Sequence, residues 1–260
     1  MSDVQALIFD CDGVLADTER DGHLVAFNLM FQELGLPFHW DDAEYARLVR
    51  IGGGKERLRS VVTDAVVARY AEPGESADDM VARWHQVKSR YFQNLVKAGK
   101  IPARPGITRL INEALAAGLK VAVASTSAEA SVRAVLESAV GEGVAARVRI
   151  FAGDIVKQKK PAPDIYLEAL RGLGVSADLA VAVEDSGQGC AAAVGAQIPV
   201  IVTVSSFTGS DDFAGAAAVV SDLGEPNEPL AIVADPNGVM AGVTAVDVGV
   251  IQTLGRANRN

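Results

Sequence analysis

The sequence predicts an α/β protein in which a doubly wound parallel sheet is interrupted near its start by an all-helical insertion. Short Val-, Ala- and Ile-rich runs recur along the chain, each bounded by charged residues, glycine or proline, as is typical of strands buried on both faces. Segments with helical spacing lie between most of these runs, and this alternation favours a parallel sheet. The stretch 18–98 breaks the alternation, because it shows helical spacing and no convincing strand.

Five apolar runs are interpreted as strands, and the ligands of such a sheet bind beyond the carboxyl ends of its strands. The strands are expected at residues 5–10, 119–125, 148–152, 180–185 and 199–204. Helices are expected at residues 107–117, 127–139, 163–173 and 188–195. A functional site should therefore be assembled from the residues that directly follow the strands.

The insertion is expected to form a domain of its own. Its apolar residues at helical spacing are Leu24, Phe27, Phe31 and Leu34, and then Met80, Trp84, Val87, Tyr91 and Leu95. We therefore divide the chain into an α/β core of residues 1–17 and 99–260 and a helical domain of residues 18–98. We expect the sheet to supply the chemistry and the insertion to act as a lid.

The end of the chain gives a weaker pattern. Turn-forming residues dominate after residue 222, so we expect irregular structure there. The spacing of Val243, Val246, Val250 and Leu254 then predicts a closing helix.

The composition is that of an acidic, enzyme-sized protein. The 260 residues carry 24 Lys+Arg against 33 Asp+Glu, which gives a net charge of -9 and a pI of about 4.9. This charge disfavours nucleic acids and anionic membranes as partners, because both would repel the protein. No apolar run approaches the roughly 20 residues that span a bilayer, and the first residues lack a signal-type segment. A cytoplasmic monomer or small homo-oligomer is expected, with Cys11 and Cys190 as small buried residues.

Two acidic pairs follow apolar runs. Asp10 and Asp12 follow the first strand, and Glu184 and Asp185 end the fourth. Each pair alone fits an Asx-type turn or a loop acid equally well. If the two strands are neighbours, however, four carboxylates converge at one edge, and these cannot all stay ionised without a cation. Oxygen ligands of this kind suit Mg²⁺.

An anionic substrate would need positive and hydrogen-bonding groups beside these acids. Lys160 stands between a strand and Pro161, which favours a defined turn, whereas the neighbouring lysines are interpreted as solvated loop residues. Ser125 and Thr126 end another strand and offer donors for a phosphoryl oxygen, together with the first amides of the next helix. Ser127 fits the role of helix N-cap.

The four motifs FDCDGVLADT, VAVAS, KKPAPDIY and VEDSGQG, in this order, resemble those of the haloacid dehalogenase superfamily. The helical insertion directly after the first motif is similar to the small cap of subclass I, which phosphoglycolate phosphatase and β-phosphoglucomutase share. The segments GGGKERL, KKPAPDIYLEAL and VEDSGQGCAAA more closely resemble the CbbY-type sugar-phosphate phosphatases. That family is associated with clearing xylulose 1,5-bisphosphate, a rubisco inhibitor. The fold implied is a Rossmann-like core with an inserted helical cap.

The resemblance also implies a mechanism. Asp10 would attack phosphorus and form an aspartyl phosphate, while Asp12 would serve as general acid and base. Mg²⁺ would be held by Asp10, Asp12 and the pair Glu184 and Asp185, of which Asp185 is favoured as the direct ligand. Ser125, Thr126 and Lys160 would bind the transferring phosphoryl group.

Substrate choice is expected to lie in the insertion. Gly53 and Lys55 belong to a glycine-rich loop before a basic helix start, which fits either a grip on a second phosphate or a plain helix-initiating turn. The CbbY-type pattern favours contact of Lys55 with substrate, followed by Arg57, and it places a histidine near His23. A small phosphorylated metabolite is the partner implied.

Three other activities share parts of this pattern. A β-phosphoglucomutase would use Asp10 and Asp12 to return the phosphoryl group to a sugar, and a phosphoglycolate phosphatase would act on a smaller ester. A receiver-type signalling domain also clusters acids around an aspartyl phosphate, but it accommodates neither Asp12 nor the large insertion. An inactive binding protein is disfavoured because every position of the four-motif set is present.

Overall fold

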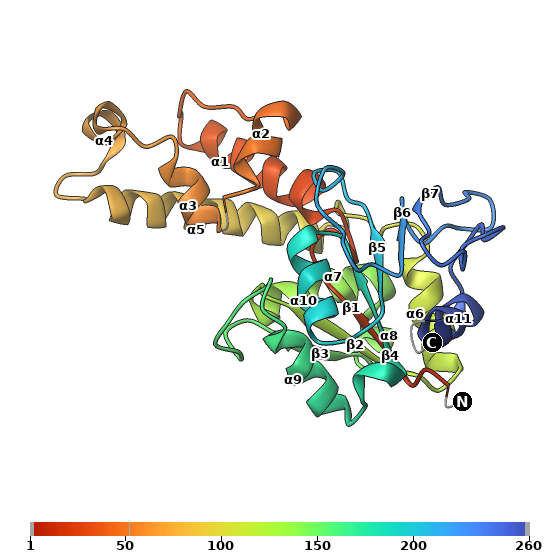
Figure 1. Cartoon of the computed structure of the whole chain (residues 1–260). Helices are drawn as coiled ribbons and strands as arrows, with labels where there is room; N and C mark the ends of the chain where they lie inside the picture. Colours follow the sequence, from red (N-terminus) through yellow and green to blue (C-terminus); the bar gives the residue numbers. More distant parts are fainter. Residues whose placement is uncertain (1–2, 52, 258–260) are drawn as a thin grey trace. The chain divides into compact units, whose positions relative to one another are not determined.

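The computed structural model describes residues 3–51 and 53–257, and the chain divides into two compact units. The first, here called the sheet unit, comprises Met1–Asp17 and Pro102–Asn260. The second, here called the helical unit, comprises Thr18–Ile101. Figure 1 shows the elements of both units. In the described part of the chain, no helix is both long and apolar enough to cross a membrane.

The sheet unit is built on one seven-stranded sheet with the order β3-β2-β1-β4-β5-β6-β7. All neighbouring strands are parallel except β6 and β7. The strands are β1 (Ala6–Phe9), β2 (Lys120–Ser125), β3 (Arg149–Ala152), β4 (Ala180–Glu184), β5 (Val200–Thr203), β6 (Ala218–Val220) and β7 (Ile232–Ala234). Phe9 at the end of β1 pairs with Val123 of β2 on one side and with Val183 of β4 on the other. The carboxyl ends of these three strands therefore reach the same edge of the sheet.

Helices cover both faces of this sheet because its central strands are apolar on both sides. Ala6 and Ile8 belong to a buried cluster with residues of α9 and α10, whereas the buried Leu7 and Phe9 alternate with them and point to the opposite face. On that side α6 contacts β2 and α11 contacts β4. The helices are α6 (Ile107–Ala116), α7 (Glu129–Val140), α8 (Glu142–Ala145), α9 (Asp164–Leu173), α10 (Gly187–Gly195) and α11 (Val248–Ala257), with a 3-10 turn at Ala177–Leu179.

The helical unit contains no strand among its described residues, as the sequence predicts. It comprises a π-helical turn at Thr18–Leu24 followed by α1 (Val25–Glu33), α2 (Asp42–Leu48), α3 (Gly54–Arg59), α4 (Asp64–Tyr70) and α5 (Ala77–Lys97). A capping box between Ser76 and Asp79 begins α5, whose buried stripe includes Met80 and Trp84. Stacked and edge-on rings of Phe27, Phe31, Trp40 and Tyr45 fill the core.

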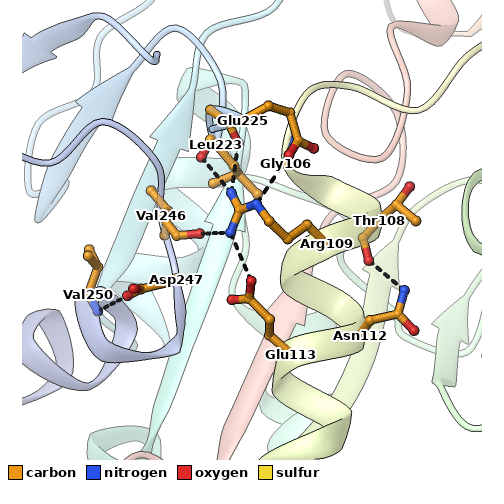
Figure 2. A network of polar contacts seen from close by, with 11 residues as sticks. Gly106, Thr108, Arg109, Asn112, Glu113, Leu223, Glu225, Val246, Asp247 and Val250 are labelled. Atoms are coloured by element: carbon orange, nitrogen blue, oxygen red, sulfur yellow. Dashed lines mark hydrogen bonds and ion pairs between the residues drawn. The ribbon is translucent and has the colours of Figure 1, made fainter. Parts of the chain in front are cut away.

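The five predicted strands are confirmed. The closing helix is present but begins only at Val248, so Val243 and Val246 precede it. β6 and β7 were not predicted. Each has only three residues and lies in or next to a segment of turn formers. Arg109 connects α6 to this last segment of the chain (Figure 2). Its guanidinium donates to the carbonyls of Leu223, Gly224 and Val246 at 3.2, 2.7 and 2.9 Å. Glu225 binds Arg109 at 3.3 Å and accepts from Gly106 N at 2.9 Å, so its carboxylate also caps α6.

Candidate active site

Three carboxylates converge at the carboxyl edge of the sheet. Ligand atoms of Asp10, Glu184 and Asp185 all lie within 4.8 Å of one another, and the three residues are buried. They meet because β1 and β4 are neighbours and Asp10 N donates to Val183 O at 2.9 Å, which fixes their register. The set is all-oxygen, compact and anionic, so it could hold a hard divalent cation.

Burial disfavours ionisation of two of these acids, Asp10 and Asp185. Desolvation raises the pKa of Asp10 from 3.8 to about 6, with Lys160 lowering it and Glu184 raising it. Desolvation, followed by the charges of Glu184 and Asp10, also raises the pKa of Asp185. A bound cation would favour the charged forms of both acids, so the cluster fits a metal site.

Lys160 lies inside this cluster. Its Nζ donates to Asp10 Oδ1 at 2.6 Å, to Glu184 Oε1 at 2.5 Å and to Ala124 O at 3.1 Å. Desolvation works against its charge, but Asp10 and Glu184 outweigh that effect and raise the pKa of Lys160. The lysine is therefore a fixed positive charge beside Asp10. The peptide bond that joins it to the following Pro161 is cis.

Ser127 connects Asp12 to the end of β2. Ser127 Oγ donates to Asp12 Oδ2 at 2.5 Å, and Ser125 Oγ accepts from Ser127 N at 3.1 Å. Thr126, half-buried, lies between the two serines in the sequence. The prediction that Ser127 caps the next helix is wrong, because Ala128 is the N-cap of α7 and the Ser127 hydroxyl is directed to Asp12.

His23 lies beside a buried lysine of the helical unit. Lys88 Nζ is 2.8 Å from His23 Nδ1 and faces the rings of Phe27 and Phe92 at 4.8 and 5.3 Å from their centroids. Lys88 is 5% exposed, so this charge is held within the unit. Lys88 was not predicted as a functional residue, because the apolar stripe expected there ran through Val87 and Tyr91, whereas the buried face of α5 runs through Lys88 and Phe92.

Arg57 is bound by the protein itself. Its guanidinium donates to Glu19, to Tyr45 Oη and to the carbonyls of Val49 and Ile51. These bonds use all five of its N–H groups. We therefore interpret Arg57 as a residue that shapes the helical unit, in place of the direct substrate contact expected from the sequence.

Gly53 and Lys55 remain accessible at the start of α3. Gly53 is the N-cap of α3 with a φ of 96°, which favours glycine. Lys55 is exposed, and its charge acts on His85. Desolvation, then Lys88 and Lys55, lower the pKa of His85 to about 4. Two lysines thus lie within electrostatic reach of one histidine in the helical unit.

Comparison with known proteins identifies the family. A model described as haloacid dehalogenase-like hydrolase matches residues 4–197. The chain belongs to this family. CbbY of Cupriavidus necator is 45% identical over 230 residues, which are 87% of this chain and 89% of that protein. The structure of a CbbY mutant from Rhodobacter sphaeroides in complex with xylulose 1,5-bisphosphate is 40% identical, with a TM-score of 0.70 over 84% of this chain and 94% of that one.

A more distant relative, phosphoglycolate phosphatase of Rhodospirillum rubrum, is 30% identical over 244 residues, 92% of this chain and 96% of that protein. This haloacid dehalogenase-like hydrolase is thus an enzyme of the phosphatase type, similar in its motifs and fold to CbbY proteins. The resemblance inferred from the four motifs is confirmed, as is the predicted fold class.

Two further residues of this hydrolase shape the acidic cluster and were missed in the sequence. The Tyr166 hydroxyl donates to Glu184 Oε1 at 2.5 Å. Gly189 faces the same carboxylate, and a Cβ there would lie 1.9 Å from Glu184 Oε2. Gly189 carries a signal in the sequence, the Gly187-Gln188-Gly189 repeat after the acids. Tyr166 does not, because its spacing on α9 matches that of a core residue.

Proposed function

We propose that this enzyme is a Mg²⁺-dependent phosphatase that hydrolyses phosphorylated sugars, with a bisphosphate such as xylulose 1,5-bisphosphate as the leading candidate. The observation that carries the proposal is the contact of Lys160 with both Asp10 and Glu184 inside a cluster of buried acids. A nucleophile, a cation site and a fixed positive charge thus lie at one sheet edge. This set is what phosphoryl transfer needs.

In the proposed reaction Asp10 attacks phosphorus and forms an aspartyl phosphate, which water then hydrolyses. Asp12 donates a proton to the leaving oxygen and then accepts one from the attacking water. Its hydrogen bond from Ser127 holds the carboxyl group in place for both transfers. Asp12 and Asp10 thus have separate partners, Ser127 and Lys160, which supports separate roles for them.

Charge on the transferring group is balanced by the chain's own donors. Lys160, Ser125 and Thr126 are proposed to bind phosphoryl oxygens, because all three follow strands that end at this edge. The Asp10 carboxylate, the backbone carbonyl of Asp12 and the pair Glu184 and Asp185 would hold Mg²⁺, with Asp185 as a direct ligand. The cation, when bound, supplies Lewis-acid stabilisation of the phosphoryl oxygens.

The helical unit is proposed to serve as the cap that selects the substrate. His23, held by Lys88, and the exposed Gly53 and Lys55 are the groups suited to bind a sugar hydroxyl or a distal phosphate. The relatives support this class of substrate, because one CbbY structure contains xylulose 1,5-bisphosphate and another contains phosphate.

A panel of phosphorylated substrates tests the proposal. The purified protein is incubated with xylulose 1,5-bisphosphate, sugar monophosphates and phosphoglycolate, and released inorganic phosphate is measured with Mg²⁺ and with EDTA. We expect Mg²⁺-dependent release that is fastest from the bisphosphate. Interconversion of sugar phosphates without net release would indicate a mutase, and a preference for phosphoglycolate would overturn the proposed substrate class.

A further inference from the structure

Tyr166 is a buried side chain of α9 whose hydroxyl contacts the acidic cluster. It lies in the first turns of α9, is fully buried, and belongs to the apolar cluster formed by β1, β4, α9 and α10. Its hydroxyl lies 2.5 Å from Glu184 Oε1. A carboxylate can only accept, so the phenol is the donor of this bond.

The same carboxylate oxygen also binds Lys160. Lys160 Nζ lies 2.5 Å from Glu184 Oε1, while Glu184 Oε2 accepts from Asp185 N at 3.2 Å. A carboxylate oxygen has two lone-pair directions, so Tyr166 and Lys160 occupy both acceptor positions of this one atom. The phenol therefore competes with the ammonium group for the negative charge of Glu184.

This competition matters because Lys160 has no spare donor among the described contacts. Its three N–H groups point to Asp10, Ala124 and Glu184, so a phosphoryl oxygen can be bound only if one of these bonds is weakened. A hydrogen bond from Tyr166 reduces the charge on Glu184 Oε1 and loosens its hold on Lys160. The Tyr166 ring, with its centroid 5.1 Å from Nζ, also limits where the ammonium group can move.

We propose that Tyr166 is a positioning residue of the phosphatase reaction, which shares Glu184 Oε1 and thereby keeps Lys160 available to the phosphoryl group. The inference rests on the proposed function, because that function assigns the phosphoryl contact to Lys160. A tyrosine with a structural role alone would change thermal stability and leave phosphate affinity as it is. A tyrosine that acts through Glu184 changes phosphate affinity.

The main test removes only the hydroxyl. In Tyr166→Phe we expect kcat and kcat/KM for p-nitrophenyl phosphate to fall about 10-fold, because the lost effect on Lys160 operates on the transferring group. The Kd of inorganic phosphate, measured calorimetrically in EDTA, should rise by a similar factor. Tyr91→Phe is the matched control: it also removes a hydroxyl that donates to a carboxylate, Glu33 at 2.6 Å, but in the helical unit. It should leave both values unchanged.

A second pair of variants tests the route through Glu184 and does not depend on the folding of Tyr166→Phe. Glu184→Gln and Asp185→Asn each replace one buried carboxyl group by an amide, but of the two only Glu184 contacts Lys160. We expect the phosphate Kd in EDTA to fall more in Glu184→Gln than in Asp185→Asn. In the Glu184→Gln background, Tyr166→Phe should have no further effect on this Kd.

The outcomes separate the inference from the proposed function. Equal phosphate Kd values in wild type and Tyr166→Phe would overturn the role of Tyr166, even in a fully active phosphatase. Equal values in Glu184→Gln and Asp185→Asn would overturn the route through Lys160. A wild-type protein that binds inorganic phosphate but hydrolyses no ester would refute the proposed function, and the Kd comparison would still decide on Tyr166.

Discussion

The carboxylate of Glu19 and the guanidinium of Arg57 form a bidentate ion pair inside the helical unit. Arg57 Nη1 lies 2.7 Å from Oε2 and Nη2 lies 3.0 Å from Oε1, and Tyr45 Oη donates to the same carboxylate at 2.7 Å. The pair joins the π-helical turn at the start of the unit to α3. It therefore fixes the start of α3, where Gly53 and Lys55 lie.

The first prediction concerns the pH dependence of this pair. Desolvation opposes the charge of Glu19, but His23 and Arg57 outweigh it and lower the pKa from 4.5 to about 2. A lowered folded-state pKa stabilises the unit fully above pH 4.5, and this stabilisation is lost as the pH falls from 4.5 to 2. Glu19→Gln should therefore cost on the order of 2–3 kcal/mol at pH 7 and less at pH 3.

The fluorescence of Trp40 and Trp84 measures this effect selectively, because both tryptophans of the chain lie in the helical unit. Urea unfolding of wild type and Glu19→Gln is followed at pH 7, 5 and 3. A stability difference that does not shrink between pH 5 and pH 3 would contradict the assignment.

Arg109 supports a second prediction, on the attachment of the last segment of the chain. Arg109→Ala leaves three carbonyls and the carboxylate of Glu225 without this donor, so we expect a loss of about 2–3 kcal/mol in unfolding free energy. Arg133→Ala is the control, because its exposed pair with Glu129 is worth about 0.5 kcal/mol or less. Thermal unfolding followed by circular dichroism measures both, and equal melting temperatures for the two variants would refute the role of Arg109.

The sequence predicted the parts of the fold that have strong periodicity. The strands β1 to β5 and their helices were predictable because buried parallel strands are continuous apolar runs, and Asp10, Lys160 and Glu184 were predictable because they follow such strands. β6 and β7 were not, since three residues carry no period. Tyr166 was missed because its spacing on α9 is that of a core residue. Lys88 was missed because the buried face of α5 is displaced by one residue from the predicted stripe.

Arg57 and Ser127 were noticed in the sequence, but their partners were not predicted. Both were recognised as polar residues near functional motifs, but their partners are set by contacts with Glu19 and Asp12, which lie 38 and 115 residues away in the sequence. Local spacing specifies that a side chain is polar. The tertiary fold decides whether it binds a ligand or another part of the protein.

The third prediction tests the close packing around Glu184. Gly189→Ala would place a Cβ 1.9 Å from Oε2 of this buried carboxylate, which would have to move. We expect roughly a 100-fold loss of kcat, as for other displacements of about 1 Å at a catalytic group. Gly143→Ala in α8 is the matched control, because its Cβ would meet no atom within 4 Å. Steady-state kinetics decides, and similar kcat values in both variants would contradict the steric argument.

A fourth prediction concerns the nucleophile. Asp10→Asn should abolish turnover, because an amide is neither a competent nucleophile nor a good cation ligand. The fold should persist, since Asn removes a charge whose ionisation is disfavoured by burial. Phosphate release and the melting temperature are measured on the same preparation. Wild-type-like turnover in the folded variant would eliminate Asp10 as the nucleophile.

The last prediction concerns substrate selection by Lys55. This lysine is exposed at the start of α3 and, with Lys88, lowers the pKa of His85, so it contributes to a local excess of positive charge in an acidic protein. Lys55→Ala should raise KM for a sugar bisphosphate about fivefold, as for one exposed charge contact of about 1 kcal/mol, and should change KM for the monophosphate less. Lys97→Ala, an exposed lysine at the end of α5, is the control. Equal changes in KM for both substrates would argue against contact of Lys55 with a distal phosphate.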